Sequence, residues 1–166
     1  DLAKPMAVDA DALSALAGHL DILRGAPAAR CLTPHPGEMA RMLGAAAGDV
    51  QRDRIAAARE FATRCRTHLV LKGAWSVVAD PDGRVVVNPT GNPGMASRGT
   101  GDVLTGMLGA FLARGLSPAA ALQSAVYLHG LAGDIASERV GEESLIASDV
   151  IAALPEAFTR LGGVGD

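Results

Sequence analysis

Short apolar segments alternate with segments of helical periodicity, and this alternation limits the fold more than any other feature of the sequence. Residues 5–8, 30–33 and 68–72 have the composition of short buried strands. Strands that alternate with helices favour a largely parallel sheet covered by helices on both faces. The pattern therefore predicts an α/β fold. The helices of this first half are expected at residues 12–20, 37–43 and 49–66.

The clearest helix signal lies in residues 49–66. Its apolar side chains recur at steps of three and four residues, at Ile55, Ala58, Phe61, Ala62 and Cys65. Two carboxylates, Asp9 and Asp11, stand just before the helix expected at residues 12–20. We expect one of them to cap that helix, and either could instead face a ligand-binding cleft.

The second half of the chain begins with a hairpin. Residues 76–79 and 85–88 flank Asp80-Pro81-Asp82-Gly83, a strong turn signal. Helices are expected after it at residues 102–113, at residues 118–138 behind the cap pair Ser117-Pro118, and after Ser148. The chain offers few strands for a parallel sheet and opens abruptly in one of them. We therefore expect that the N-terminal portion of the domain is missing from this chain.

Composition and charge exclude several classes of protein. A chain of 166 residues with 49% hydrophobic and 20% charged residues fits one globular domain. An aromatic content of 3% and a net charge of −3 argue against a nucleic-acid partner. The apolar stretch 104–113 is too short to cross a membrane, and no signal-peptide pattern opens the chain. Cys31 and Cys65 form no CxxC motif, which suits a reducing cytosol and predicts a cytoplasmic protein.

The strongest functional signal is the run from Asn88 to Asp102, which is rich in glycine, proline and asparagine. It ends in Gly99-Thr100-Gly101 and leads into an apolar helix, so free backbone N–H groups would surround an anion there. A carboxylate such as Asp102 is unfavourable beside an anion unless it accepts a proton or holds a hydroxyl or a metal. The alternative is a surface loop that ends in an acidic helix cap.

Two shorter segments carry further candidates. His35 stands between two prolines in Leu32-Thr33-Pro34-His35-Pro36-Gly37-Glu38, between a strand and a helix, where α/β sheets place ligand-binding residues. A turn with an exposed histidine explains this segment equally well. At the end of a later strand, Lys72 could reach a phosphate, and Gly73 would allow a nucleotide to approach the backbone. Taken alone, an ordinary strand-end lysine is the simpler interpretation.

The other histidines give no signal of a site. His129 lies within an apolar helix and is expected in the core, and His19 and His68 have no neighbours at metal-ligand spacing. We therefore single out no metal ligand. Neither the P-loop pattern nor the dinucleotide-binding glycine pattern is present, so neither supports nucleotide binding.

Three segments taken together resemble one known family. They read LTPHPGEMARMLG, VLKGAWSVV and NPTGNPGMASRGTGDVLTGMLGAFLARGLSPAAALQSAVYLHGLAGD. In this order they look like the ADP/ATP-dependent NAD(P)H-hydrate dehydratases, whose domain is related to the ribokinase-like small-molecule kinases. The resemblance implies a ribokinase-like three-layer α/β/α sandwich, with residues 1–166 as the C-terminal portion of a single domain. In many bacteria an NAD(P)H-hydrate epimerase domain is fused upstream of it.

The resemblance also implies an activity and a set of site residues. The family removes water from hydrated NADH or NADPH with hydrolysis of ADP or ATP and with Mg²⁺. His35 matches a residue that contacts the hydrated dinucleotide, and Asp102 matches the aspartate at the hydrated ring, where the related kinases have their catalytic base. Arg98 departs from the family, which usually has glycine there. A homo-oligomer is expected, and nucleotide contacts are expected from Lys72, Gly73, Ala74, Trp75, Ser76, Gly99, Thr100 and Gly101.

Two other functions remain open on the sequence alone. A small-molecule kinase of the same fold, for example one that phosphorylates a vitamin-precursor alcohol, would share residues 99–102. The segments 33–38 and 88–95 favour the dehydratase over this kinase. A catalytically silent nucleotide-binding module is the alternative from another class of protein.

Overall fold

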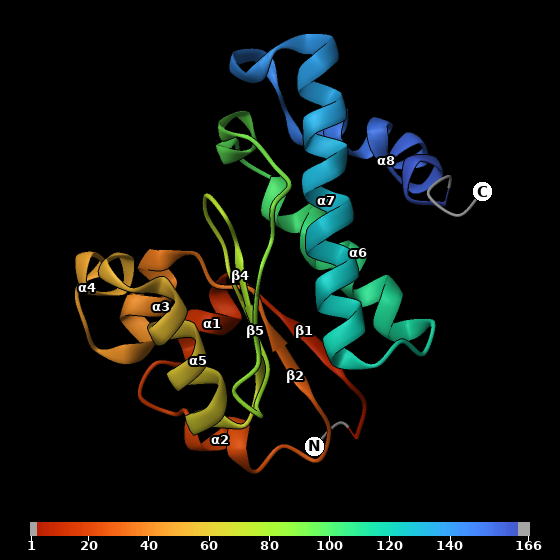
Figure 1. The fold of residues 1–166 in the computed structure, drawn as a ribbon. Coiled ribbons are helices and arrows are strands. Elements are labelled where there is room, and N and C mark those ends of the chain that lie inside the picture. The colour runs from red at the N-terminus through yellow and green to blue at the C-terminus, as the bar shows by residue number, and fades with distance from the viewer. Residues whose placement is uncertain (1–2, 163–166) are drawn as a thin grey trace.

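A five-stranded sheet in the order β1-β2-β3-β4-β5 runs through the middle of the molecule in this computed structural model, which describes residues 3–162 (Figure 1). The first three strands pair in parallel, and the last three pair antiparallel. The sheet is therefore mixed, and the expected parallel arrangement describes its first half. The strands are β1 (Met6–Val8), β2 (Arg30–Leu32), β3 (His68–Leu71), β4 (Val77–Ala79) and β5 (Val85–Val87).

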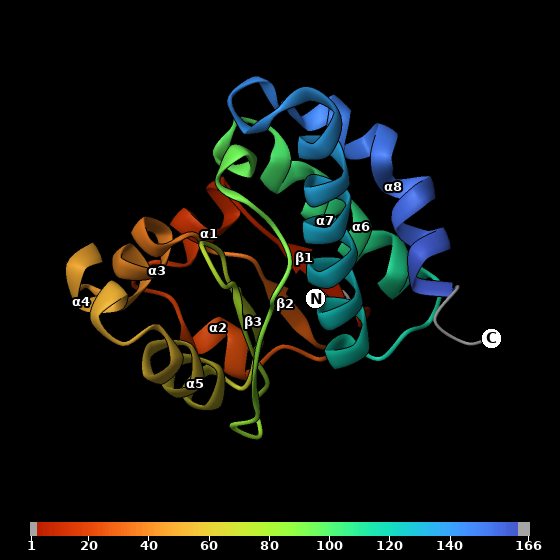
Figure 2. The same ribbon diagram turned by 45° about the horizontal axis from the view of Figure 1, so that its top comes forward.

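Helices cover both faces of this sheet, as Figure 2 shows. One face is covered by α1 (Asp11–Leu16), α2 (Asp21–Arg24), α3 (Pro36–Leu43), α4 (Ala47–Arg52) and α5 (Arg54–Cys65). The other is covered by α6 (Thr100–Ala113), α7 (Pro118–Val140) and α8 (Ala147–Gly162). Two short 3-10 helices, η1 (Pro93–Ala96) and η2 (Glu142–Ser144), lie in the connections. The expected three-layer α/β/α sandwich is confirmed.

The two hydrophobic cores follow from the alternation of side chains along each strand. In β2, Cys31 packs in the core beneath α6 and α7, whereas its neighbour Leu32 packs in the core beneath α1–α5. In β3, Val70 and Leu69 divide between the same two cores. A strand buried on both faces has no polar positions, which explains why the sequence shows it as a continuous apolar run.

Two of the expected helices are wrong in their extent. The helix expected at residues 12–20 ends at Leu16, and α2 forms separately, because Gly18 adopts a φ of +82° that no helix continues through. The helix expected at residues 49–66 is divided at Asp53. This residue leaves the helical conformation, and its side chain accepts a hydrogen bond from the Ala56 N–H (2.8 Å), which starts α5.

The loop from Asn88 to Gly99 packs against bare backbone on α7. A Cβ at Gly130 would lie 2.2 Å from Thr90 Oγ1, and a Cβ at Gly133 would lie 2.1 Å from the Met95 sulfur. These two glycines, one helical turn apart, therefore let the loop lie directly on the helix. The expected long loop is confirmed, with η1 as a single turn inside it.

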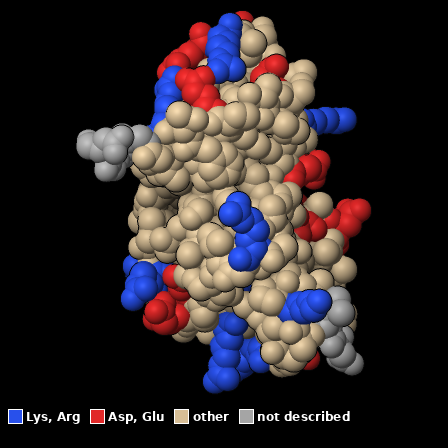
Figure 3. Space-filling view, turned by 90° about the vertical axis from the view of Figure 1, so that its right-hand side faces the viewer, with Lys and Arg blue, Asp and Glu red and all other residues tan. Residues whose placement is uncertain are grey.

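One side of the molecule carries few charges. Viewed from the right of Figure 1, a broad area carries few charges apart from one Lys or Arg side chain near its centre, and most of the charged side chains lie toward its edges (Figure 3). The exposed apolar side chains of α8 are Ile151, Phe158 and Leu161. No helix in the described part of the chain is both long enough and apolar enough for a bilayer.

The close approach at α7 predicts opposite effects for two glycine substitutions. Gly130→Ala should lower the free energy of unfolding by about 1–3 kcal/mol, because the added methyl group displaces the Thr90 backbone. Gly109→Ala in α6 is the matched control, since no described atom beyond its own helix backbone lies within 4 Å of the added Cβ. It should raise the stability by about 0.5–1 kcal/mol. Denaturant unfolding measures both, and equal effects would contradict the packing described here.

Candidate functional site

A cleft of about 700 Å³ opens at the edge of the sheet where β1, β2, β3 and β5 end. Its walls come from segments far apart in the sequence: the start of α3, the β3–β4 connection, the loop that follows β5, the first turn of α6 and the middle of α7. In open α/β sheets this edge is the usual place for a ligand. A second groove of similar volume, between α4 and α5, contains none of the residues predicted from the sequence.

Most of the predicted site residues line this cleft. The lining includes His35, Lys72, Gly73, Ala74, Trp75, Ser76, Thr100 and Gly101. Gly99 and Asp102 flank the lining residues of α6 without belonging to them. Asp102 is exposed in the first turn of α6. The structure thus brings the three predicted segments together and places Asp102 at the margin of the cleft.

The first turn of α6 presents free backbone donors to the cleft. Gly99 caps the helix with a φ of +88°, a conformation that favours glycine, and no side chain caps the helix start. Within residues 3–162, the N–H groups of Gly101 and Asp102 have no hydrogen-bond acceptor. Amides of this kind at a helix N-terminus attract anions. The predicted anion site at residues 99–101 therefore has the geometry it needs.

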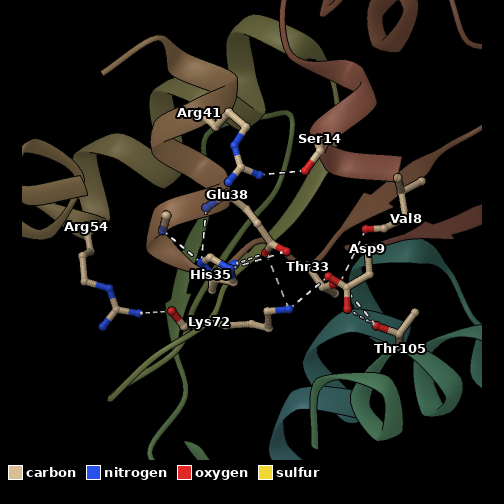
Figure 4. Close-up of polar contacts among 11 residues, drawn as sticks. Val8, Asp9, Ser14, Thr33, His35, Glu38, Arg41, Arg54, Lys72 and Thr105 are labelled. Atoms are coloured by element: carbon tan, nitrogen blue, oxygen red, sulfur yellow. Dashed lines mark hydrogen bonds and ion pairs between the residues drawn. The ribbon is translucent and has the colours of Figure 1, made fainter. Parts of the chain in front are cut away.

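A lysine stands beside this helix start. Lys72 Nζ lies 3.0 Å from Asp9 Oδ1 and 3.8 Å from Glu38 Oε2, as Figure 4 shows. A Cβ at Gly101 would be 3.4 Å from the same Nζ. The ammonium group therefore lies between two carboxylates and the open N-terminus of α6, where it offsets the negative charge of Asp9 and Glu38 beside the anion site.

Asp9 lies beside the first turn of α6, outside the lining of the cleft, and caps no helix. Its Oδ2 accepts a hydrogen bond of 2.8 Å from Thr105 Oγ1 of α6, while its Oδ1 accepts from Lys72 (Figure 4). Burial raises the pKa of this carboxyl, but the hydrogen bonds from Lys72 and Thr105 outweigh that effect, so its net pKa lies below the ordinary value. Asp9 is therefore ionised, and helix capping by Asp9 or Asp11 is wrong: the N-cap residue of α1 is Ala10, and no side chain caps this helix.

His35 combines exposure with an unexpected capping role. Its Nδ1 accepts hydrogen bonds from the N–H groups of Gly37 (3.0 Å) and Glu38 (3.2 Å), and the Glu38 carboxylate accepts one from the His35 N–H (2.7 Å). This reciprocal cap starts α3. Because Nδ1 is an acceptor, the neutral ring carries its proton on Nε2. The side chain is 54% exposed, so the imidazole is presented as predicted.

Arg54 of α5 fixes the β3–β4 connection through backbone carbonyl oxygens, a role that the sequence did not reveal. Its Nη2 donates to the carbonyl oxygens of Leu71 (2.9 Å) and Lys72 (3.2 Å), and its Nη1 donates to that of Ala74. The guanidinium also fills the space beside Gly73, where a Cβ would lie 2.9 Å from Nη2. One side chain thus fixes a loop in which Trp75 adopts a φ of +55°.

Asp134 of α7 is a second anchor that the sequence did not reveal. Its carboxylate accepts hydrogen bonds from the Gly91 N–H (2.9 Å) and from Asn92 Nδ2 (3.0 Å). Nearby, Thr90 Oγ1 donates to the Tyr127 carbonyl of the same helix (2.9 Å). These contacts fix the long loop on α7 above the glycines described earlier.

The carboxylates around the cleft do not form a preassembled metal cage. The described residues contain no group of three or more His, Cys, Asp or Glu side chains arranged for a metal ion. Asp9 and Glu38 already pair with Lys72. Mg²⁺ in nucleotide sites is usually held by phosphate oxygens, waters and one or two carboxylates. The described lining of the cleft holds no Asp or Glu, so phosphate oxygens and waters would supply most ligands of an ion that arrives with a nucleotide, and Asp102 is the nearby carboxylate without a partner among the described residues.

The fold and the cleft define a protein of the ribokinase-like class. A ribokinase-like superfamily protein from Enterococcus faecalis superposes with a TM-score of 0.73 at 26% identity, over 93% of this chain and 52% of that one. The sequence profile of the NAD(P)H-hydrate dehydratases matches residues 1–156. The chain belongs to this family.

Individual relatives agree with this assignment. A bifunctional NAD(P)H-hydrate repair enzyme of Moorella thermoacetica is 48% identical over 95% of this chain, which covers 30% of that protein. An ADP-dependent (S)-NAD(P)H-hydrate dehydratase of Neisseria meningitidis is 40% identical over 90% of this chain, which covers 52% of it. The Bacillus subtilis ADP/ATP-dependent dehydratase, co-crystallised with ATP/Mg²⁺, has a TM-score of 0.84 at 37% identity, over 94% of this chain and 55% of that one. The chain thus spans about a third to a half of these relatives.

Removal of the guanidinium at position 54 should loosen the β3–β4 connection. In Arg54→Lys, a single ammonium cannot reach three carbonyl oxygens, so the Lys72 amide, which donates to the Pro34 carbonyl (2.8 Å), should exchange hydrogen at least about fivefold faster, an effect of roughly 1 kcal/mol per lost hydrogen bond. Arg59→Lys, an exposed position of the same helix, should leave this exchange unchanged. Hydrogen-exchange mass spectrometry measures both variants. Equal protection in Arg54→Lys and the parent would contradict the role of Arg54.

Proposed function

We propose that the complete protein removes water from hydrated NADH or NADPH in a reaction that consumes ADP or ATP with Mg²⁺. Membership of the dehydratase family supports this activity. The observation that carries the proposal is the juxtaposition of Lys72 with the open N-terminus of α6 in a cleft large enough for a nucleotide. Amides and an ammonium group converging on one point suit a transferring phosphoryl group.

The nucleotide is assigned to the part of the cleft between the β3–β4 connection and the long loop. Lys72, Gly73, Ala74, Trp75 and Ser76 form one wall, with the exposed indole of Trp75 as a flat apolar surface beside the opening. The phosphates would then point toward Gly99, Thr100 and Gly101, where the backbone donors lie. When bound with the nucleotide, Mg²⁺ would supply positive charge that offsets the charge of the transferring group.

His35 and Asp102 are assigned to the hydrated dinucleotide. His35 presents an Nε2–H donor at the rim of the cleft, because its Nδ1 is occupied by the cap of α3. Asp102 lies in the first turn of α6, the same turn whose free amides would hold the transferring phosphoryl group. In this position it can accept a proton from a hydroxyl that attacks this group.

The chemistry follows from the poor leaving ability of hydroxide. Asp102 takes the proton of the ring hydroxyl, while the hydroxyl oxygen forms a bond to the terminal phosphorus of the nucleotide. The bond between this phosphorus and the oxygen that joins it to the next phosphate breaks. The ring C–O bond then breaks with phosphate as the leaving group, and loss of a proton from the neighbouring ring carbon restores the dihydronicotinamide. The departing water oxygen thus leaves within inorganic phosphate, and ADP becomes AMP.

The proposal also covers the longer protein to which this chain belongs. We assign residues 1–166 to the C-terminal portion of a single ribokinase-like domain, within a longer protein in which an NAD(P)H-hydrate epimerase domain can precede it. The support is that bifunctional relatives are more than three times as long as the matched region. A homo-oligomer in the cytoplasm belongs to the same proposal.

The reaction is tested by mixing the complete protein with hydrated NADPH, Mg²⁺ and either ADP or ATP. Dihydronicotinamide absorbance should return only when a nucleotide is present, with release of one inorganic phosphate for each NADPH formed. A stable phosphorylated product without NADPH would support the small-molecule kinase. Nucleotide binding without either product would support the silent binding module.

Asp102→Asn separates catalysis from binding. The amide keeps the size of the side chain but cannot accept the hydroxyl proton, so turnover should fall by at least about a hundredfold. ADP affinity should be equal or slightly higher, because a negative charge beside the phosphate site is removed. Kinetics and calorimetric titration of the same preparation measure both quantities. Turnover close to that of the parent would leave Asp102 without a part in the reaction.

A further inference from the structure

His129 makes a contact that its apolar helix gives no reason to expect. Its ring lies in the wall of the cleft, and its Nε2 is 2.9 Å from the carbonyl oxygen of Thr100 at the start of α6. A carbonyl oxygen can only accept a hydrogen bond, so Nε2 is the donor and carries the proton. Burial lowers the pKa of His129 to about 4, and the nearby Lys72 charge acts in the same direction. The ring is therefore neutral at physiological pH.

The carbonyl that His129 holds belongs to the peptide group that supplies the Gly101 N–H. A peptide group is planar, and its C=O and N–H bonds point in opposite directions. An orientation imposed on the Thr100 carbonyl is therefore imposed on the Gly101 N–H as well. Gly101 lines the cleft, and its N–H has no acceptor within the described residues.

The side chain of Thr100 makes further contacts that fix this residue. The hydroxyl lies within hydrogen-bond distance of the carbonyl oxygens of Met95 (2.7 Å) and Ser97 (2.8 Å), and the residue is 6% exposed. These contacts fix the position of Thr100 relative to the long loop. As the first residue of α6, Thr100 also accepts the Leu104 N–H at its carbonyl oxygen, as in any α-helix. His129 adds a second donor to this oxygen and so holds the exposed first turn, and the peptide group that follows Thr100, against fraying.

We propose that His129 is a positioning residue that orients the Thr100–Gly101 peptide group so that its N–H points at a phosphate of the bound nucleotide. This inference rests on the proposed nucleotide site. His129 itself does not contact the phosphate; it acts on the Gly101 N–H, which does. His129 should therefore affect the binding of the phosphates of ADP or ATP, and should not affect the binding of the adenosine part.

The test compares ligands with and without phosphates in the complete protein. His129→Ala should weaken ADP and ATP binding by roughly threefold to tenfold, the usual effect of one hydrogen bond. Adenosine affinity should not change. His129→Gln, whose side-chain amide can donate to the same carbonyl, should restore most of the ADP affinity. His19→Ala, a substitution of an exposed histidine outside the cleft, is the control for both ligands.

A second measurement needs no ligand. The amide resonance of Gly101 in ¹⁵N-labelled protein should shift or broaden in His129→Ala and return toward the parental position in His129→Gln. Thermal unfolding of each variant shows whether the fold is retained, and the amide resonances of α8 provide an internal reference. An unchanged Gly101 resonance in His129→Ala would overturn the proposal, whatever the affinities are.

The binding outcomes keep this inference apart from the proposed function. If the parent binds ADP and His129→Ala weakens adenosine and ADP equally, the histidine is a packing residue and the inference is wrong. If His129→Ala binds ADP as the parent does, the inference is also wrong, while the nucleotide site stands. If the parent binds neither ADP nor ATP, the proposed function falls together with the inference.

Discussion

The contact between Lys72 and Asp9 joins the ends of two strands, β3 and β1, that are separated in the sheet by β2. Thr105 extends this contact to α6, and Glu38 extends it to α3. The ammonium group is thus placed before any ligand arrives, and four elements converge on it (Figure 4). An incoming phosphate does not need to order the lysine, which removes part of the entropic cost of binding. Loss of Lys72 would leave Asp9 as an unpaired carboxylate beside the anion site.

Helix α7 provides the other fixed surface on which the cleft depends. One of its faces carries His129, Gly130, Gly133 and Asp134, which contact the first turn of α6 and residues 90–95 of the loop that precedes it. The run from Asn88 to Asp102 looks like a flexible loop when only its composition is considered. On α7 it is a fixed wall, because polar anchors and close backbone packing act on the same short segment.

The sequence predicted the parts of this site that depend on strand order and failed for the parts that depend on backbone acceptors. Because parallel strands end at one edge, the alternation of elements placed His35 and Lys72 in one cleft. Arg54 and His129 were missed because both donate to carbonyl oxygens about 20 and 29 residues away. Every residue has such an oxygen, so residue types carry no trace of the contact. The glycines of α7 were the available signal, since glycine inside a helix needs a reason.

The change from parallel to antiparallel pairing at β3 has a practical consequence. Strand β4 carries the chain away from the cleft, and β5 returns it, so that Asn88 N–H meets the Ser76 carbonyl at 2.8 Å on the same edge from which the chain departed. The Pro81–Gly83 turn therefore lies a full strand length away from the ligand. A fluorophore or an inserted peptide tag at this tip would label the protein without entering the cleft where the nucleotide is expected. The hairpin thus offers a natural attachment point for tethering the protein to a surface.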